Sequence, residues 1–420
     1  MINLRRLRDD ELYRTGALHK GVDSSTLDRL LDLSEGHRLA LAEAEALRAE
    51  SNVASKEIGR AAPEERQAKI EAAGELKVRL TAAEAALGAA DEELTKLALT
   101  IPNPAHESVP VGGEDDYRVE ATVGDQSPPP AFDHGELGER LGIVDTERAV
   151  RMSGSRFAYI MGDAVRLQLA LVQWTLAKVA EHGFVPVITP VLVREEMMEL
   201  AGFFPTDRNQ VYALEADELY LIGTSEVALA GLHRQERIAE ADLPVRYAGY
   251  SSCFRREAGT YGKDTTGLFR VHQFDKVEMF IYAHPDRSWE ELELLRRIQE
   301  DIVGGLGLPY RVITVASGDL GAAAAKKYDL EVWLPSEQRY REVTSCSNYT
   351  DYSARRMSTR IKTDEGNVLA HTLNGTACAI GRTLLYIFEN HQRPDGSVVV
   401  PDVLHPFCPG LEVIGPAATA

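Results

Sequence analysis

A heptad pattern near the N-terminus constrains the fold of this chain more than any other feature. Small and apolar residues recur there at alternating spacings of three and four, in two stretches separated by Gly59 and Pro63, with His37 and Ser51 also in the first stretch. The repeated positions are Leu30, Leu33, Ala40, Ala44, Leu47, Ala54 and Ile58 in the first stretch, and Ala73, Leu76, Leu80, Ala83, Leu87, Ala90, Leu94 and Leu97 in the second. The pattern predicts two antiparallel helices over about residues 27–58 and 66–98, each about 45 Å long at 1.5 Å rise per residue.

The length of this predicted arm needs a physical reason, because two helices alone bury little apolar surface. One reason is dimerisation, which is the usual role of a heptad pattern. The other is reach toward a distant partner. Basic residues follow the arm, but carboxylates outnumber them. The charge of the arm therefore does not decide between the two, and both alternatives stay open at this point.

The composition excludes several classes of protein. The chain has 420 residues and a formal net charge of −19, so a general basic coat for nucleic acid is excluded and any RNA contact requires a local basic patch. No apolar run approaches the length of a membrane span. Its four cysteines are far apart, at positions 253, 346, 378 and 408, which argues against disulfides and a thiolate zinc site. The expected location is the cytoplasm, with no membrane partner.

The remainder of the chain predicts a second, larger domain. Residues 101–130 are rich in proline and glycine and resemble a linker region. Runs of strands with flanking helices follow, without strict alternation, which favours an α+β fold built on a mainly antiparallel sheet. The expected helices cover residues 155–182, 195–202, 289–304 and 377–391, and the expected strands cover residues 218–224, 246–254, 310–315, 330–334 and 367–373.

Residues 250–280 read as two strands joined by a glycine-rich loop. In the second strand Val277, Met279 and Ile281 alternate with polar residues, and Phe269 and Val271 extend the apolar face. A hairpin of this kind serves either as a platform for a ligand or as an ordinary solvated surface. The residue types favour neither alternative decisively.

Nucleotide-binding loops of the P-loop and Rossmann types are absent from the sequence, so a bound nucleotide would need another device. Five polar groups are candidates, and each has a plainer structural explanation. Arg255 and Glu257 could bind phosphate and base or form a cross-strand ion pair. Arg382 could bind an anion or extend to solvent. Glu342 and Ser345 could hold a hard cation or form a turn. Thr224 to Glu226 and Asn374 to Thr376 could face a small zwitterion or cap the helices that follow them.

Taken in order, these segments resemble a class II aminoacyl-tRNA synthetase, specifically the bacterial type of the seryl-tRNA synthetase family. The resemblance covers nearly the whole chain. It is carried by the arm and by the stretches RMSGSRF, PVITP, TSE, CFRREAGTYGKDTTGLFRVHQFDKVE, REVTSCSNYTDYSARR and HTLNGTACAIGR. Small departures occur at Ser225, Ser353 and Thr376, and none of them removes a needed functional group.

The resemblance implies a role for each candidate residue. It implies that Arg255 and Arg382 are catalytic and that Glu342 and Ser345 hold Mg²⁺, with no zinc. The implied ATP-binding residues are Arg255, Arg256, Glu257, Val271, Phe274, Glu342, Val343, Thr344, Ser345 and Arg382, with Phe274 stacking on adenine. The implied serine-binding residues are Thr224, Ser225, Glu226, Arg255, Glu278, Asn374 and Thr376.

The implied activity is ATP-dependent serine–tRNA ligation. Serine and ATP would form seryl-adenylate, and serine would then pass to the 3′ end of tRNA(Ser), and of tRNA(Sec) where it is present. The resemblance also implies a homodimer, a tRNA-binding arm domain over residues 1–100, a linker region over 101–130 and a catalytic domain over 131–420. The loop at residues 259–267 would guide the tRNA acceptor end. The alternative is a paralogue that loads a small amino acid onto a carrier protein.

Overall fold

The computed structural model describes residues 1–259 and 267–415. The chain divides into two compact units, Met1–Glu107 and Ser108–Ala420. In the described part of the chain, none of the helices is both long and apolar enough to cross a membrane.

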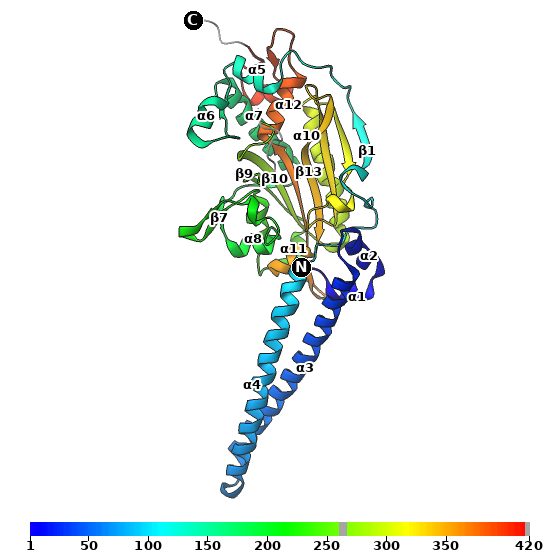
Figure 1. Ribbon diagram of the computed structural model, residues 1–420, viewed down its shortest axis with the longest axis vertical. Helices are drawn as coiled ribbons and strands as arrows, with labels where there is room; N and C mark the ends of the chain where they lie inside the picture. The colour runs from blue at the N-terminus through cyan, green and yellow to red at the C-terminus, as the bar shows by residue number, and fades with distance from the viewer. Residues whose placement is uncertain (260–266, 416–420) are drawn as a thin grey trace. The chain divides into compact units, whose positions relative to one another are not determined.

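The first unit contains the predicted helical arm. Two short helices, α1 (Leu4–Asp9) and α2 (Glu11–His19), precede α3 (Ser24–Arg60) and α4 (Pro63–Thr100). Figure 1 shows α3 and α4 running side by side and joined by a short turn. Both helices are longer than the heptad pattern predicts. Pro63 occupies the first turn of α4, where its missing N–H costs no hydrogen bond, so it begins the helix instead of separating the two.

Packing within the arm is thin. Halfway along it, Ala44 and Leu47 of α3 pack against Ala83 of α4, with three half-buried leucines around them. Arg48 forms an ion pair of 2.7 Å with Glu84 across the two helices, but both side chains are about half exposed, so the pair adds little stability. A separate apolar cluster at the base of the arm joins α1 and α2 to the near ends of α3 and α4.

The second unit is built on one large sheet, in agreement with the predicted α+β fold (Figure 1). Across the sheet the strands are β1 (Arg118–Val123), β11 (Tyr310–Thr314), β12 (Lys326–Leu334), β13 (Arg339–Thr350), β16 (His371–Ala379), β10 (Gln273–Ala283), β9 (Val245–Phe254) and β4 (Val185–Ile188). Every neighbouring pair is antiparallel except β4 and β9. Strand β1 lies within the segment predicted as a linker, so part of that segment belongs to the sheet.

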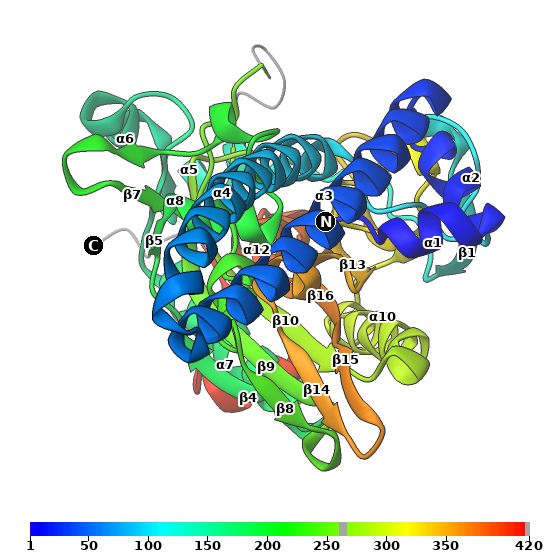
Figure 2. The ribbon, with the colours of Figure 1, turned by 90° about the horizontal axis from the view of Figure 1, so that it is seen from below.

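Helices cover one face of this sheet and form the main core with it. They are α7 (Asp163–Glu181), α10 (Ser288–Gly305) and α12 (Ile380–Asn390). Figure 2 shows α10 lying beside the sheet near β13 and β16. The alternation predicted for the second hairpin strand is confirmed, because Val277, Met279 and Ile281 of β10 all point into this core. A smaller apolar cluster lies around Phe280 and Tyr282 of β10.

Smaller elements complete the second unit. The short helices are α5 (His134–Arg140), α6 (Thr146–Ser153), α8 (Glu195–Ala201), α9 (Glu226–Gly231) and α11 (Tyr352–Met357). The small sheets comprise β2 (Val144–Asp145) with β3 (Tyr159–Ile160), β5 (Leu192–Arg194) with β7 (Leu219–Leu221) and β6 (Ala213–Leu214), β8 (Arg237–Ala239) with β14 (Arg360–Thr363) and β15 (Gly366–Leu369), and β17 (Val398–Val399) with β18 (Val413–Ile414).

Several predicted boundaries are wrong, and the strand predicted over residues 367–373 is two strands, β15 and β16. The helix predicted from residue 155 begins only at Asp163, because β3 and a turn at Gly162 precede it. The last helix begins at Ile380, since β16 continues through Thr376 to Ala379 while it is paired with β10. The second hairpin strand begins at Gln273. Phe269 and Val271 therefore precede the strand, but Phe269 is still buried in the same core as Val277, Met279 and Ile281.

Candidate active site

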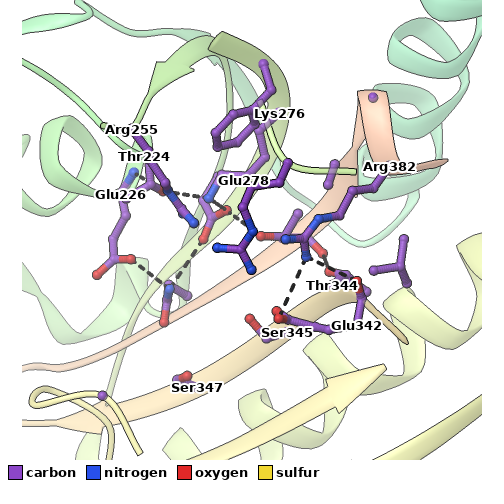
Figure 3. A pocket seen from close by; sticks show the side chains of 18 of the residues that line it. Thr224, Glu226, Arg255, Lys276, Glu278, Glu342, Thr344, Ser345, Ser347 and Arg382 are labelled. Carbon is purple, nitrogen blue, oxygen red and sulfur yellow. Dashed lines mark hydrogen bonds and ion pairs between the residues drawn. The ribbon is translucent and has the colours of Figure 1, made fainter. Parts of the chain in front are cut away.

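A cavity lies against the other face of the sheet, where β10, β16 and β13 run side by side (Figure 3). It is also lined by the first residue of α9, the first turn of α12 and the chain just before β10. Fourteen of the residues proposed from sequence line this cavity: Thr224, Glu226, Arg255, Glu257, Val271, Phe274, Glu278, Glu342, Val343, Thr344, Ser345, Asn374, Thr376 and Arg382.

One end of the cavity is a buried polar cluster centred on Glu278 of β10. Lys276 forms an ion pair of 2.6 Å with the Glu278 carboxylate, and the Thr376 hydroxyl donates to it at 3.0 Å. Lys276 also donates to the Thr224 hydroxyl at 2.7 Å. Because Thr376 faces Glu278 from the middle of β16, it does not cap the last helix. The alternative that it caps is therefore wrong.

Glu226 is the second carboxylate of this cluster. The Asn374 amide donates to Glu226 at 2.8 Å and to Glu278 at 3.3 Å, and so bridges the two acids. Burial and the nearby charge of Glu278 together raise the pKa of Glu226 to about 7, against the opposing effect of Lys276. Two buried carboxylates that share one amide, with an ammonium paired to only one of them, form a site suited to a small cation with hydrogen-bond donors.

Arg255 lies beside this cluster (Figure 3), and Phe274 lines the same cavity. The Arg255 guanidinium lies 5.3 Å from the centre of the Phe274 ring, and its Nε donates to the Gly223 carbonyl at 3.3 Å. Glu257 forms its ion pair with Arg270, at 2.8 Å. The cross-strand pair between Arg255 and Glu257, which the sequence left open, is therefore replaced by a longer-range pair.

Arg382 marks the opposite end of the cavity. Its guanidinium donates to the Glu342 carbonyl at 3.1 Å and lies 3.7 Å from the Glu342 carboxylate. Arg382 and Arg341 both lie over the Phe269 ring, at 4.8 and 3.8 Å from its centre. Arg382 faces the cavity from the first turn of α12, so the alternative that it extends to solvent is wrong.

Glu342 and Ser345 both lie within β13, which excludes the turn considered from the sequence. Loss of contact with water raises the pKa of Glu342, but the charges of Lys327 and Arg382 outweigh that effect and hold the pKa below its usual range. One carboxylate and one hydroxyl fit Mg²⁺, which keeps several waters and takes its other ligands from phosphates. A self-sufficient group of three or more acidic, histidine or cysteine ligands does not occur among residues 1–259 and 267–415.

Two of the residues proposed from sequence do not line the cavity. Ser225 is buried behind it, where its hydroxyl donates to the Gly249 carbonyl at 3.3 Å. A side chain on Gly249 would come within 3.0 Å of the Ser225 hydroxyl, so these two residues pack against each other. Arg256 is exposed and lies 6.0 Å from the centre of the Tyr212 ring. Both residues are neighbours of the cavity and do not form its wall.

Sequence reasoning missed several residues of the cavity wall. The residues without an assigned role include Phe269, Arg270, Lys276, Lys327, Ser347 and Tyr349. Lys276 could have been found, because it alternates with Phe274 and Glu278 on the same face of a predicted strand. No comparable signal marked Lys327, which comes from β12, outside the three strands that form the centre of the cavity.

Comparison with known proteins agrees with the geometry. The family model described as "Seryl-tRNA synthetase N-terminal domain" matches residues 1–105. The model described as "tRNA synthetase class II core domain (G, H, P, S and T)" matches residues 210–391. The two matches fall on the helical arm and on the part of the chain that forms the cavity.

Individual relatives match over the full length. The chain is 48% identical to the serine–tRNA ligase of Thermobifida fusca over 100% of both chains. It is 38% identical to a seryl-tRNA synthetase from Pyrococcus horikoshii solved in complex with ATP, with a TM-score of 0.91 and full coverage of both chains. It is 32% identical to the cytoplasmic enzyme of Naegleria fowleri in complex with AMP, with a TM-score of 0.88, covering 100% of this chain and 99% of that one. The chain belongs to the seryl-tRNA synthetase family.

Proposed function

We propose that the cavity activates L-serine with ATP and then passes serine to tRNA. The observation that carries this assignment is the buried cluster of Glu226, Glu278 and Asn374 next to the Arg255 guanidinium. The acids suit an ammonium group and the guanidinium suits a carboxylate or phosphate. A small zwitterion that meets an α-phosphate at Arg255 satisfies both requirements.

Serine specificity follows from hydrogen bonding. Serine is small, so apolar contact cannot separate it from alanine or glycine by a large factor. Thr376 and Glu278 already share a hydrogen bond of 3.0 Å, and a serine hydroxyl beside them could join that network. Alanine would leave the same buried groups without a partner, which is the stronger source of discrimination.

The first reaction step needs positioning more than covalent chemistry. A serine carboxylate oxygen attacks the α-phosphorus of ATP, the bond from that phosphorus to the bridging oxygen breaks, and pyrophosphate leaves. Arg255 would hold the α-phosphate and the serine carboxylate, and Phe274 would stack on adenine with Arg382 on its other side. Glu257 and Val271 would contact adenine, and their place in the cavity wall supports this. The cationic side chains stabilise charge that builds up in the transition state.

Mg²⁺ would be held by Glu342 and Ser345. When bound, it would neutralise charge on the phosphates and orient the leaving group. Val343 and Thr344 lie between these two residues and line the same wall, which supports a phosphate-binding role for this stretch of β13.

In the second step a hydroxyl of the tRNA terminal ribose attacks the acyl carbon and AMP leaves. We assign tRNA binding to the domain of residues 1–100, the segment 101–130 to a linker that also supplies β1, and catalysis to residues 131–420. The loop at residues 259–267 would guide the acceptor end, although its residues 260–266 lie outside the described structure. The substrates would be tRNA(Ser) and, where it is present, tRNA(Sec).

A homodimer in the cytoplasm completes this proposal. The support for the dimer is the edge strand β4, where Val185 is 56% and Ile188 is 84% exposed. Exposed apolar residues on an unpaired sheet edge are typical of an interface. The alternative function is loading of a small amino acid onto a carrier protein. That function would leave the long arm without a role.

One experiment separates the two functions. ATP–pyrophosphate exchange is measured with serine, glycine, alanine and threonine, and transcripts of tRNA with and without a long variable arm are then tested for charging. We expect exchange with serine alone and charging of the long-armed transcripts. Exchange with serine but no charging of any tRNA would favour the carrier-protein paralogue.

A further inference from the structure

Lys327 is a cation of the cavity wall that takes no part in the contacts proposed above for ATP, serine or Mg²⁺. It lies on β12 directly opposite Ser347 of β13, and both residues line the cavity. The Lys327 side chain is 21% exposed. Because the residue belongs to the cavity wall, that exposed part is accessible to a ligand in the cavity.

The Lys327 ammonium is held in place by acidic groups. It lies 2.9 and 3.1 Å from the two carboxylate oxygens of Asp329, which is opposite Ser345 in the strand register. Burial lowers the pKa of Lys327, but the carboxylates of Asp329, Glu342 and Asp319 outweigh that effect and raise the pKa above its usual range. Lys327 is therefore a fixed positive charge on the side of the cavity where Glu342 and Ser345 lie.

The net charge of the cavity wall depends on this lysine. The described lining residues include four carboxylates, Glu226, Glu257, Glu278 and Glu342, and five cations, Arg255, Arg270, Lys276, Lys327 and Arg382. Lys276 is engaged with Glu278 and Arg270 with Glu257. Without Lys327 the formal charges of the described lining residues would cancel, so Lys327 gives the wall its one excess positive charge, with Asp329 as a counter-ion that does not line the cavity.

We propose that Lys327 is a further ATP-binding residue, which supplies a permanent positive charge to the triphosphate beside Glu342 and Ser345. This inference rests on the proposed function. It assigns to Lys327 part of the charge neutralisation that a divalent cation also provides. The contribution of Lys327 to ATP binding should therefore be larger when Mg²⁺ is withheld.

A purely structural role is the competing explanation, in which Lys327 only neutralises the buried Asp329. The double variant Lys327→Met/Asp329→Asn separates the two roles. It removes both charges together, so no unpaired charge is left buried and the fold should be kept. A structural pair predicts normal ATP binding in this double variant, whereas a phosphate contact predicts weak binding.

The experiment is calorimetric titration of the full-length protein with ATP, once with Mg²⁺ and once with EDTA. We expect the double variant to bind ATP about tenfold more weakly with Mg²⁺, the loss typical of a hydrogen bond to a charged group. The loss should be larger in EDTA, the KM for serine should stay the same, and Lys327→Arg alone should recover most of the affinity.

Lys326→Met is the matched control. Lys326 is the preceding residue of the same strand, but its ammonium lies 4.7 Å from the centre of the Tyr328 ring and it does not line the cavity. This variant should bind ATP like the original protein. ATP binding by the folded double variant within twofold of the original, with and without Mg²⁺, would overturn the role of Lys327. Failure of the unmodified protein to bind ATP would instead contradict the proposed function.

Discussion

The arm and the sheet unit differ in how much apolar surface they bury. In the arm, α3 and α4 are long, yet midway along them only Ala44, Leu47 and Ala83 are buried together. In the sheet unit a continuous core extends under the large sheet, and the opposite face carries a cavity with buried charges. The comparison indicates that length and reach matter in the arm, whereas exact placement of a few groups matters in the sheet unit.

The largest expected effect comes from the cavity. Arg255→Ala should lower serine-dependent ATP–pyrophosphate exchange by about a thousandfold or more, because it removes a cation from the reacting phosphate. The arm should remain folded, and its helical content, followed by circular dichroism, serves as the control. Exchange at the original rate would contradict the site assigned here.

Shortening the arm should impair tRNA charging and leave ATP–pyrophosphate exchange unchanged. Replacing residues 41–87 by a short Gly-Ser linker keeps the base cluster of Leu27, Leu30, Leu94 and Ala98. If the arm binds tRNA as proposed, charging of tRNA should fall by about a hundredfold or more, since phosphate contacts of the removed segment would be lost, while exchange is unchanged. Normal charging by the shortened protein would show that the arm has a role other than tRNA binding.

Glu226→Gln tests the serine end of the cavity. The substitution keeps the size of the side chain but removes the charge that would face the serine ammonium. We expect the KM for serine to rise by about a hundredfold, and the KM for ATP to stay the same, because the altered group lies at the end of the cavity away from Glu342. Initial rates of exchange at varied serine and varied ATP provide the measurement, and equal changes in both constants would argue against this division of the cavity.

The pH dependence of serine binding should follow the same carboxylate. The pKa of Glu226 is raised to about 7, so the group is ionised above that pH and becomes protonated as the pH falls below it. A protonated Glu226 no longer attracts an ammonium, so the KM for serine should rise below pH 7 by up to about tenfold per pH unit. Glu226→Gln should abolish this dependence, and a slope that persists in the variant would assign the titration to another group.

The smallest effect on catalysis should come from the packing of the arm. Leu47→Ala should weaken local stability by about 2 kcal/mol, visible as faster hydrogen exchange in α3 and α4, with no change in ATP–pyrophosphate exchange. The matched variant Leu295→Ala, in the core beneath the sheet, should lower the melting temperature of the whole second unit. Loss of catalysis in the arm variant would mean that the two units are energetically coupled.

Prediction from sequence succeeded where structure depends on near neighbours. The helices of the arm and the buried face of β10 both follow from spacings of a few residues, and both agree with the structure. Prediction failed where a distant partner decides the outcome. Strand β16 continues through Thr376 because it pairs there with β10, and nothing within the local sequence indicates that partner.

The candidate site was likewise predictable in its residue types but not in its contacts. Its residue types could be named from motifs, and fourteen of them meet around one cavity. The sequence did not reveal that Ser225 packs behind the wall against Gly249, or that Glu257 pairs with Arg270.

The sequence by itself determined the arm, the fold class and the chemical types of the candidate residues, because periodicity and residue chemistry are properties of short segments. Only the tertiary structure decided which charges share the cavity. The pairing of β12 with β13 brings Lys327 and Asp329 beside Ser347 and Ser345. The physical reason is that charges act through space at distances of a few ångströms, and those distances are set by strand pairing between segments far apart in the chain.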